Sequence, residues 1–182
     1  MRSFYKPSIF VKLMAMASSE RDSKLERLKS EYSKLQKKYS LPSFEEINNY
    51  FDIEVIAGKH FDRLLRAVRR RITEKTSSYL RFMEVFLNPA QAPLFYMMLA
   101  KNMSEEGRKA INEIYFELGK IEILHIEIEN IDSDDKEAEF IKEIFGSWPK
   151  IRESMNVMVD IFKKSWKKGW WRQKGVLMPD TR

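Results

Sequence analysis

The segment that decides the fold class is residues 110–131, AINEIYFELGKIEILHIEIENI. Its main apolar residues recur at intervals of three, four and seven, so they share one face of an α-helix. They are Ile111, Ile114, Leu118, Ile121 and Ile128. Three more apolar residues, Phe116, Ile123 and Ile126, fall on the far side of the same helix. Because a helix that is apolar on two sides needs neighbours on both, we expect it at the centre of a helical bundle.

The flanking segments carry the same periodicity. In residues 60–87 an apolar stripe holds one side over seven turns, with arginines on the opposite side. Residues 19–39 contain about two heptads, which is fewer than a coiled coil needs. These patterns predict an all-α protein: a single bundle of about six to seven helices with a peripheral, coiled-coil-like N-terminal helix.

Several helix ends can be placed from capping residues. We expect Ser18 and Ser19 to start the first helix, Ser43 with Glu46 to form a capping box, and Ser104 to cap the central helix. After a helix that ends at Gly146, the segment 147–149 with its proline opens the last one.

These ends define the predicted domain organisation. Residues 1–18 form an N-terminal extension, residues 19–172 form one helical domain, and residues 173–182 form a C-terminal tail.

Composition excludes several function classes. The chain has no cysteine, which removes thiol catalysis, disulfides and thiolate metal sites, and it has no glycine-rich phosphate loop. The longest uncharged run, residues 85–100, contains two prolines and is too short to span a membrane. No nucleophilic or acid–base constellation stands out. We therefore expect a cytoplasmic, non-enzymatic protein without a cofactor and without a membrane partner.

Charge is strongly segregated along the chain, whose formal net charge is +6. Residues 59–87 and 150–182 are basic, whereas residues 104–145 are acidic. In one interpretation the acidic segment neutralises the basic ones within the fold, with residues 132–139 as the internal partner of the arginines. In the other, a basic surface is left for an anionic partner.

The second interpretation rests on eight candidate contact residues. The region 162–174 combines six basic residues with three tryptophans and no acid, a composition suited to phosphates and unpaired bases. Its basic residues also suit the negative end of a helix dipole. The candidates are Arg63, Arg66, Arg70, Lys164, Lys167, Lys168, Trp171 and Arg172.

A third cluster, Glu122, His125 and Glu129, lies within the central helix. Glu-x-x-His places both side chains on one helix face, as carboxylate-bridged metal sites in helical bundles require. Such sites need a second motif of this kind, which the sequence lacks. We therefore expect no metal here and treat these residues as the candidates if one binds.

Together these observations predict a helical binding protein whose anionic partner is nucleic acid or an acidic protein. One alternative is a homo-oligomeric scaffold, a homodimer through the helix in residues 19–39 with the Met97–Met98 region contributing. The other alternative is a metal–carboxylate bundle.

Overall fold

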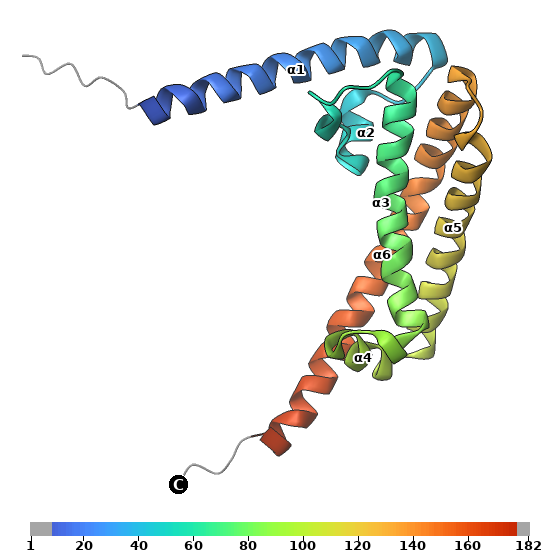
Figure 1. The fold of residues 1–182 in the computed structure, drawn as a ribbon. Helices are drawn as coiled ribbons and strands as arrows, with labels where there is room; N and C mark the ends of the chain where they lie inside the picture. The colour runs from blue at the N-terminus through green and yellow to red at the C-terminus, as the bar shows by residue number, and fades with distance from the viewer. Residues whose placement is uncertain (1–8, 178–182) are drawn as a thin grey trace, which may run out of the picture. The chain divides into compact units, whose positions relative to one another are not determined.

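The computed structural model describes the backbone of residues 9–177 and the side chains of residues 19–90 and 92–167. Every regular element in that range is helical, which confirms the all-α prediction (Figure 1). The α-helices are α1 (Ile9–Tyr39), α2 (Phe44–Phe51), α3 (Leu64–Leu87), α4 (Leu94–Lys101), α5 (Glu105–Glu129) and α6 (Asp134–Leu177). Two short 3₁₀ helices, η1 (Ile53–Ile56) and η2 (Pro89–Gln91), lie in the connections.

The helices form two compact units. The first combines the chain up to Ile72 with residues 133–142, and the second combines residues 73–132 with the chain from Glu143 onward. The continuous helices α3 and α6 contribute residues to both units.

The first unit is organised around Tyr32 of α1, whose side chain is completely buried. Its ring packs edge-on against Phe44 of α2 at 5.8 Å, and its hydroxyl donates a hydrogen bond to the Pro42 carbonyl at 3.0 Å. Burial, with a smaller effect of the Glu46 carboxylate, raises the pKa of the Tyr32 hydroxyl well above its ordinary value. The heptad stripe of α1 is therefore used to dock α1 on its own chain.

The predicted capping box between Ser43 and Glu46 is confirmed at the start of α2. The Ser43 side chain accepts from the Glu46 backbone N–H at 3.2 Å, and the Glu46 carboxylate accepts from the Ser43 N–H at 2.9 Å. Asp52, in the left-handed region with φ 51°, then ends α2. These local contacts set the direction in which α2 leaves the docked end of α1.

In the second unit α5 packs with one side against the C-terminal half of α3 and against α6. Ser77 of α3 donates to the Glu122 carboxylate at 2.6 Å, and Phe86 of α3 stacks on Phe162 of α6 at 4.6 Å. The predicted stripe of α5 is buried as expected, and Ser104 caps this helix. The buried stripe comprises Ile111, Ile114, Leu118, Ile121 and Ile128.

The expectation of neighbours on both sides of α5 is wrong. The far-side residues Phe116, Ile123 and Ile126 are 65%, 59% and 64% exposed. The reason is that α5 contacts α3 through Glu122 and approaches α6 at Gly107. Both contacts lie toward the side of α5 that carries the buried stripe. The far side is an exposed apolar surface, which we call the α5 face.

Two predicted helix ends are also wrong. Helix α1 begins at Ile9, so Ser18 and Ser19 are interior; the preceding residues are good helix formers without glycine or proline. Helix α6 runs through Pro149 without a break, although proline inside a helix typically costs ~3 kcal/mol. Buried side chains on both sides of the proline offset that cost, since Ile144, Trp148 and Ile151 are each at most 3% exposed.

The described residues therefore overlap the predicted extension and tail. Helix α6 continues to Leu177, inside the predicted tail 173–182, whereas residues 1–8 and 178–182 lie outside the described part of the chain. None of the helices within that part has a stretch long and apolar enough to cross a membrane.

Two glycines of α5 provide a matched test of this packing. A Cβ added at Gly107 would lie 2.7 Å from Cγ of Met103 and 2.9 Å from Cγ2 of Ile161, whereas one added at Gly119 meets nothing within 4 Å. We expect Gly107→Ala to lower the free energy of unfolding by about 1–3 kcal/mol. Gly119→Ala should raise it by about 0.5–1 kcal/mol, because alanine favours the helix. Urea unfolding followed by circular dichroism measures both, and equal effects would contradict the close approach of α5 to Ile161.

Candidate functional site

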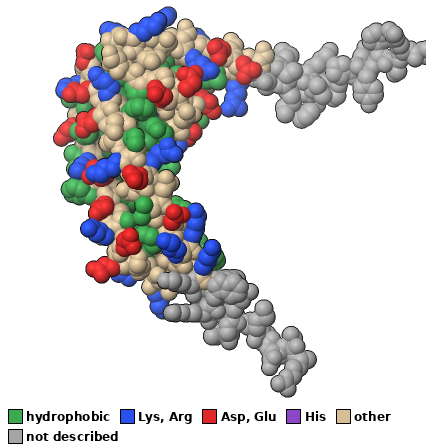
Figure 2. Space-filling view, turned by 180° about the vertical axis from the view of Figure 1, so that it is seen from behind, with side chains coloured by type: hydrophobic (Ala, Val, Ile, Leu, Met, Phe, Trp, Pro, Cys, Tyr) green, Lys and Arg blue, Asp and Glu red, His purple; other side chains and the backbone are tan. Residues whose placement is uncertain are grey.

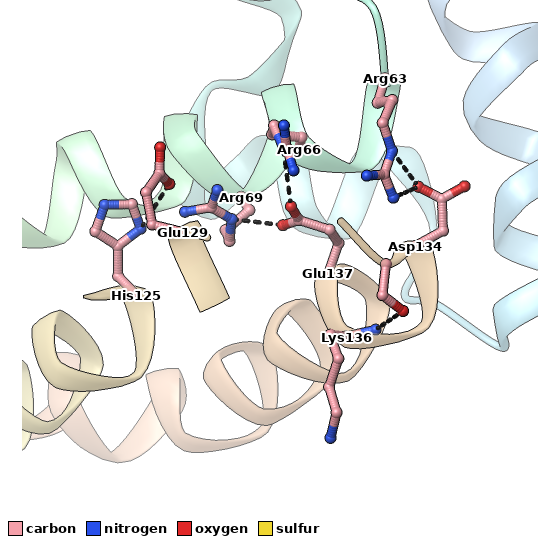
Figure 3. Close-up of polar contacts among 9 residues, drawn as sticks. Arg63, Arg66, Arg69, His125, Glu129, Asp134, Lys136 and Glu137 are labelled. Atoms are coloured by element: carbon pink, nitrogen blue, oxygen red, sulfur yellow. Dashed lines mark hydrogen bonds and ion pairs between the residues drawn. The ribbon is translucent and has the colours of Figure 1, made fainter. Parts of the chain in front are cut away.

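The predicted arginine face of α3 lies against the first turns of α6 in the first unit (Figure 3). Arg63 donates to one carboxylate oxygen of Asp134 through Nε at 3.0 Å and through a terminal nitrogen at 2.5 Å. Arg66 and Arg69 both donate to Glu137, at 3.3 Å and 2.5 Å. The prediction that the acidic run 132–139 is the internal partner of these arginines is confirmed.

Burial separates these pairs in importance. The side chains of Arg69 and Glu137 are 0% and 1% exposed, whereas those of Arg63 and Asp134 are 23% and 38% exposed. A carboxylate buried to this degree is stable as an anion only with charged partners, and Glu137 has two. Glu137 is thus the centre of a cluster that ties the start of α6 to α3.

Lys38, in the last turn of α1, lies near the acids Asp134 and Asp135 of this region. The pKa of the Lys38 ammonium lies above its ordinary value, first because of its hydrogen bond with Tyr39 and then because Asp134 and Asp135 lie nearby. Of the predicted contact residues in this region, Arg63 and Arg66 are engaged with acids and partly buried, whereas Arg70 is exposed. The internal pairing lowers the positive charge that Arg63 and Arg66 offer to a partner. Partner binding by the three arginines stays a prediction.

We call residues 162–174, with their six basic side chains, the cationic segment of α6. Its described lysines differ from the arginine face of α3 in their ion pairing. Lys163 pairs with Asp160 at 3.1 Å, but Lys164 and Lys167 are exposed, and no acid within the described residues is recorded as their ion-pair partner. The side chains of the other three predicted contacts, Lys168, Trp171 and Arg172, lie outside the described residues.

Trp166 lies between these two lysines. Its ring is 37% exposed and is tilted by 52° against the Phe95 ring of α4, with the centroids 5.2 Å apart. Figure 2 shows one face of the molecule, on which blue cationic, red acidic and green apolar side chains are interspersed. The net charge therefore does not locate a cationic surface on this face, whereas Lys164 and Lys167 are individually exposed cations.

The carboxylate–histidine cluster of α5 is not arranged as a metal site. The Glu122 carboxylate accepts from Ser77, and Nδ1 of His125 lies 4.0 Å from a Glu129 carboxylate oxygen. Within the part of the chain whose side chains are described, no group of three or more His, Cys, Asp or Glu residues is placed to hold a metal ion. The geometry therefore offers no support for the metal–carboxylate alternative.

A pocket that the sequence analysis missed lies in the second unit, among the end of α3, α4 and the start of α5. We call it the α4 pocket; its volume is about 960 Å³. It is lined by Phe86, Leu87, Pro89, Ala90, Leu94, Met97, Met98, Ala100, Lys101, Asn102, Met103, Arg108, Ile111 and Asn112.

One sequence signal does point to this pocket. The run 94–99 is apolar at every position, and a helix of eight residues cannot bury all sides of such a run. Leu94 and Met97 are accordingly 72% and 41% exposed, whereas Leu99 is 5% exposed. The lining residues that come from α3 and α5 cannot be assigned to the pocket without the tertiary structure.

The buried pair tests the cluster around Glu137. We expect Glu137→Gln to lower the free energy of unfolding by about 3–5 kcal/mol, because it removes the negative charge that pairs with the buried Arg69. The matched control is Glu139→Gln on the same helix, which removes only an exposed pair with Lys136 and should leave the urea midpoint unchanged. An unchanged midpoint for Glu137→Gln would contradict the central role of Glu137 in this cluster.

Comparison with protein-family models, with curated proteins and with solved structures gives no match for this chain. No function is thus carried over from a relative. Residue roles follow from the contacts, burial and charge described above.

Proposed function

We propose that the protein is a non-enzymatic helical binding protein that contacts an anionic partner through the cationic segment of α6. The observation that supports this most is the exposure of Lys164 and Lys167 on α6, whose sequence has no acid from Ile161 to its end at Leu177. Positions 164, 167, 168 and 171 are three and four residues apart, so they share one face of α6.

The helix dipole does not account for these lysines. Its effect is confined to the last turn of a helix, and α6 ends at Leu177, well beyond Lys167. Structural pairing does not account for them either, in contrast to Arg63 and Arg66. Solvated cations beside an exposed tryptophan ring suit a chain of phosphates with unpaired bases, so single-stranded nucleic acid is the favoured partner.

Fluorescence anisotropy with a labelled 20-nucleotide oligo-dT tests this proposal. Binding should weaken steeply between 50 and 200 mM NaCl, because it releases counterions from the phosphates. The double variant Lys164→Gln/Lys167→Gln should bind more weakly and reduce the slope of log K against log salt by about 1.4, since each lost phosphate contact accounts for about 0.7 on a single strand.

The matched control is Lys109→Gln/Lys142→Gln, which removes the same charge from exposed positions elsewhere. It should leave the slope unchanged. Absence of binding at 50 mM NaCl overturns the proposal. Competition by polyglutamate as effective as that by unlabelled oligo-dT would favour an acidic protein as the partner instead.

A second candidate, a homo-oligomeric scaffold, is supported by the α5 face. Three large apolar side chains more than half exposed on one helix cost free energy in water, and a second copy of the chain would cover them. The heptad stripe of α1 supports this alternative less, since Leu28 and Tyr32 are already buried within the chain. A homodimer through residues 19–39 stays a prediction, as does the cytoplasmic location.

Light scattering at increasing protein concentration tests the α5 face. We expect the mass to rise toward that of a dimer, and Ile123→Glu to keep the protein monomeric because a carboxylate at the centre of the face is not readily desolvated. The control Val55→Glu introduces the same charge at an exposed apolar residue that belongs to the first unit and lies outside the α5 face. It should leave association unchanged. A monomer at every concentration removes this candidate.

A further inference from the structure

We propose that the α4 pocket binds a free single-chain carboxylate, an anionic amphiphile with its aliphatic tail inside and its head group at the residues that begin α5. This function is separate from nucleic-acid binding, since among the residues whose side chains are described, none of those that line the pocket belongs to α6.

The size of the pocket suits a small molecule. Its volume of about 960 Å³ lies within the ~300–1,000 Å³ range of small-molecule sites. Most of the lining is aliphatic, and three methionines contribute to it: Met97, Met98 and Met103. Methionine side chains are flexible and polarizable, so they adapt to a flexible hydrocarbon chain better than a rigid wall would.

The polar lining is confined to one part of the chain. Its four polar side chains, Lys101, Asn102, Arg108 and Asn112, come from the end of α4 and the first turns of α5, whereas the lining from α3, η2 and the rest of α4 is apolar. A ligand that pairs with these four side chains and also covers the apolar lining needs a polar head group and an apolar tail, which describes an amphiphile. A ligand with polar groups along its whole length would leave most of them unpaired.

The sign of the head group follows from the charges. Lys101 and Arg108 are cations, and no aspartate or glutamate is among the lining residues described. Both side chains are exposed, and among the described residues no acid forms an ion pair with either of them. The Asn102 amide nitrogen already donates to the Met98 carbonyl at 3.0 Å, and the Asn112 amide adds a further hydrogen-bond donor, so the polar lining matches a carboxylate.

The apolar end is incompletely covered by the protein itself. Leu87, Leu94 and Met97 line the pocket and are 40%, 72% and 41% exposed. An aliphatic tail seated on them removes apolar surface from water, and every buried methylene contributes about 0.8 kcal/mol. We favour the free acid over a bilayer lipid as the source of the aliphatic tail, because the α4 pocket has the size of a site for a single small ligand.

Titration with 11-dansylaminoundecanoate, a fluorescent single-chain carboxylate, tests the proposal. We expect a saturable rise in fluorescence with one site per chain, and displacement by dodecanoate below its micellar concentration. Dodecanol and dodecyltrimethylammonium should displace the probe at least tenfold less well, because they lack the negative head group.

Two variants locate the site. Lys101→Gln/Arg108→Gln should weaken probe binding at least tenfold, whereas Lys109→Gln, an exposed cation of α5 outside the lining, should not change it. Ala90→Trp at the exposed wall of the pocket should abolish binding while the circular dichroism spectrum stays that of the wild type.

Three results would overturn the inference. They are the absence of saturable binding to the wild type, equal displacement by dodecyltrimethylammonium, and binding to phosphatidylglycerol vesicles without binding to the free acid. A double variant that binds as tightly as the Lys109→Gln control would overturn the assignment of the head-group site.

Discussion

The first unit depends on one buried carboxylate. Glu137 links α6 to α3, because Arg66 and Arg69 of α3 both donate hydrogen bonds to its carboxylate (Figure 3). The Arg69 side chain is completely buried. Burying a charge costs desolvation free energy, which the two paired arginines offset, so the position of Glu137 depends on contacts from both helices. Pairing with Asp134 and Glu137 also lowers the positive charge that Arg63 and Arg66 contribute to the surface, compared with the sequence-based expectation.

The second unit follows different physics. Its core is apolar, with α5 buried along one stripe and with aromatic contacts such as Phe86 on Phe162 between α3 and α6. What distinguishes it is the apolar surface that this core does not use, on the far side of α5 and around α4. Binding functions suit such a unit, because exposed apolar side chains gain free energy when a ligand or a partner covers them.

The chemistry of these surfaces separates the proposals. The cationic segment of α6 offers solvated lysines and suits a polyanion, whose binding depends on salt. The α4 pocket has the volume of a small-molecule site and combines a mostly apolar lining with Lys101 and Arg108, so it suits a small anionic amphiphile. The α5 face has no comparable group of cations and suits a second copy of the chain.

Local physics determined much from sequence alone. Apolar spacing is enough to identify α3 and the buried stripe of α5, and the Ser43–Glu46 capping box is a contact between residues three apart. The prediction that residues 132–139 pair with the arginines also held, since opposite charges of this density attract within one fold. Each of these features depends on residues near in sequence or on the sign of whole segments.

Only the tertiary structure decided which apolar and charged groups are covered. Periodicity identifies two apolar sides of α5 but cannot say that one of them stays exposed to water. Proline normally ends a helix, but α6 continues through Pro149, where flanking side chains such as Trp148 are buried. The α4 pocket combines residues from α3, η2, α4 and α5, so no local pattern contains it. Burial depends on contacts between residues far apart in sequence, and for that reason the candidate sites, unlike the helices, could not be derived from the order of amino acids alone.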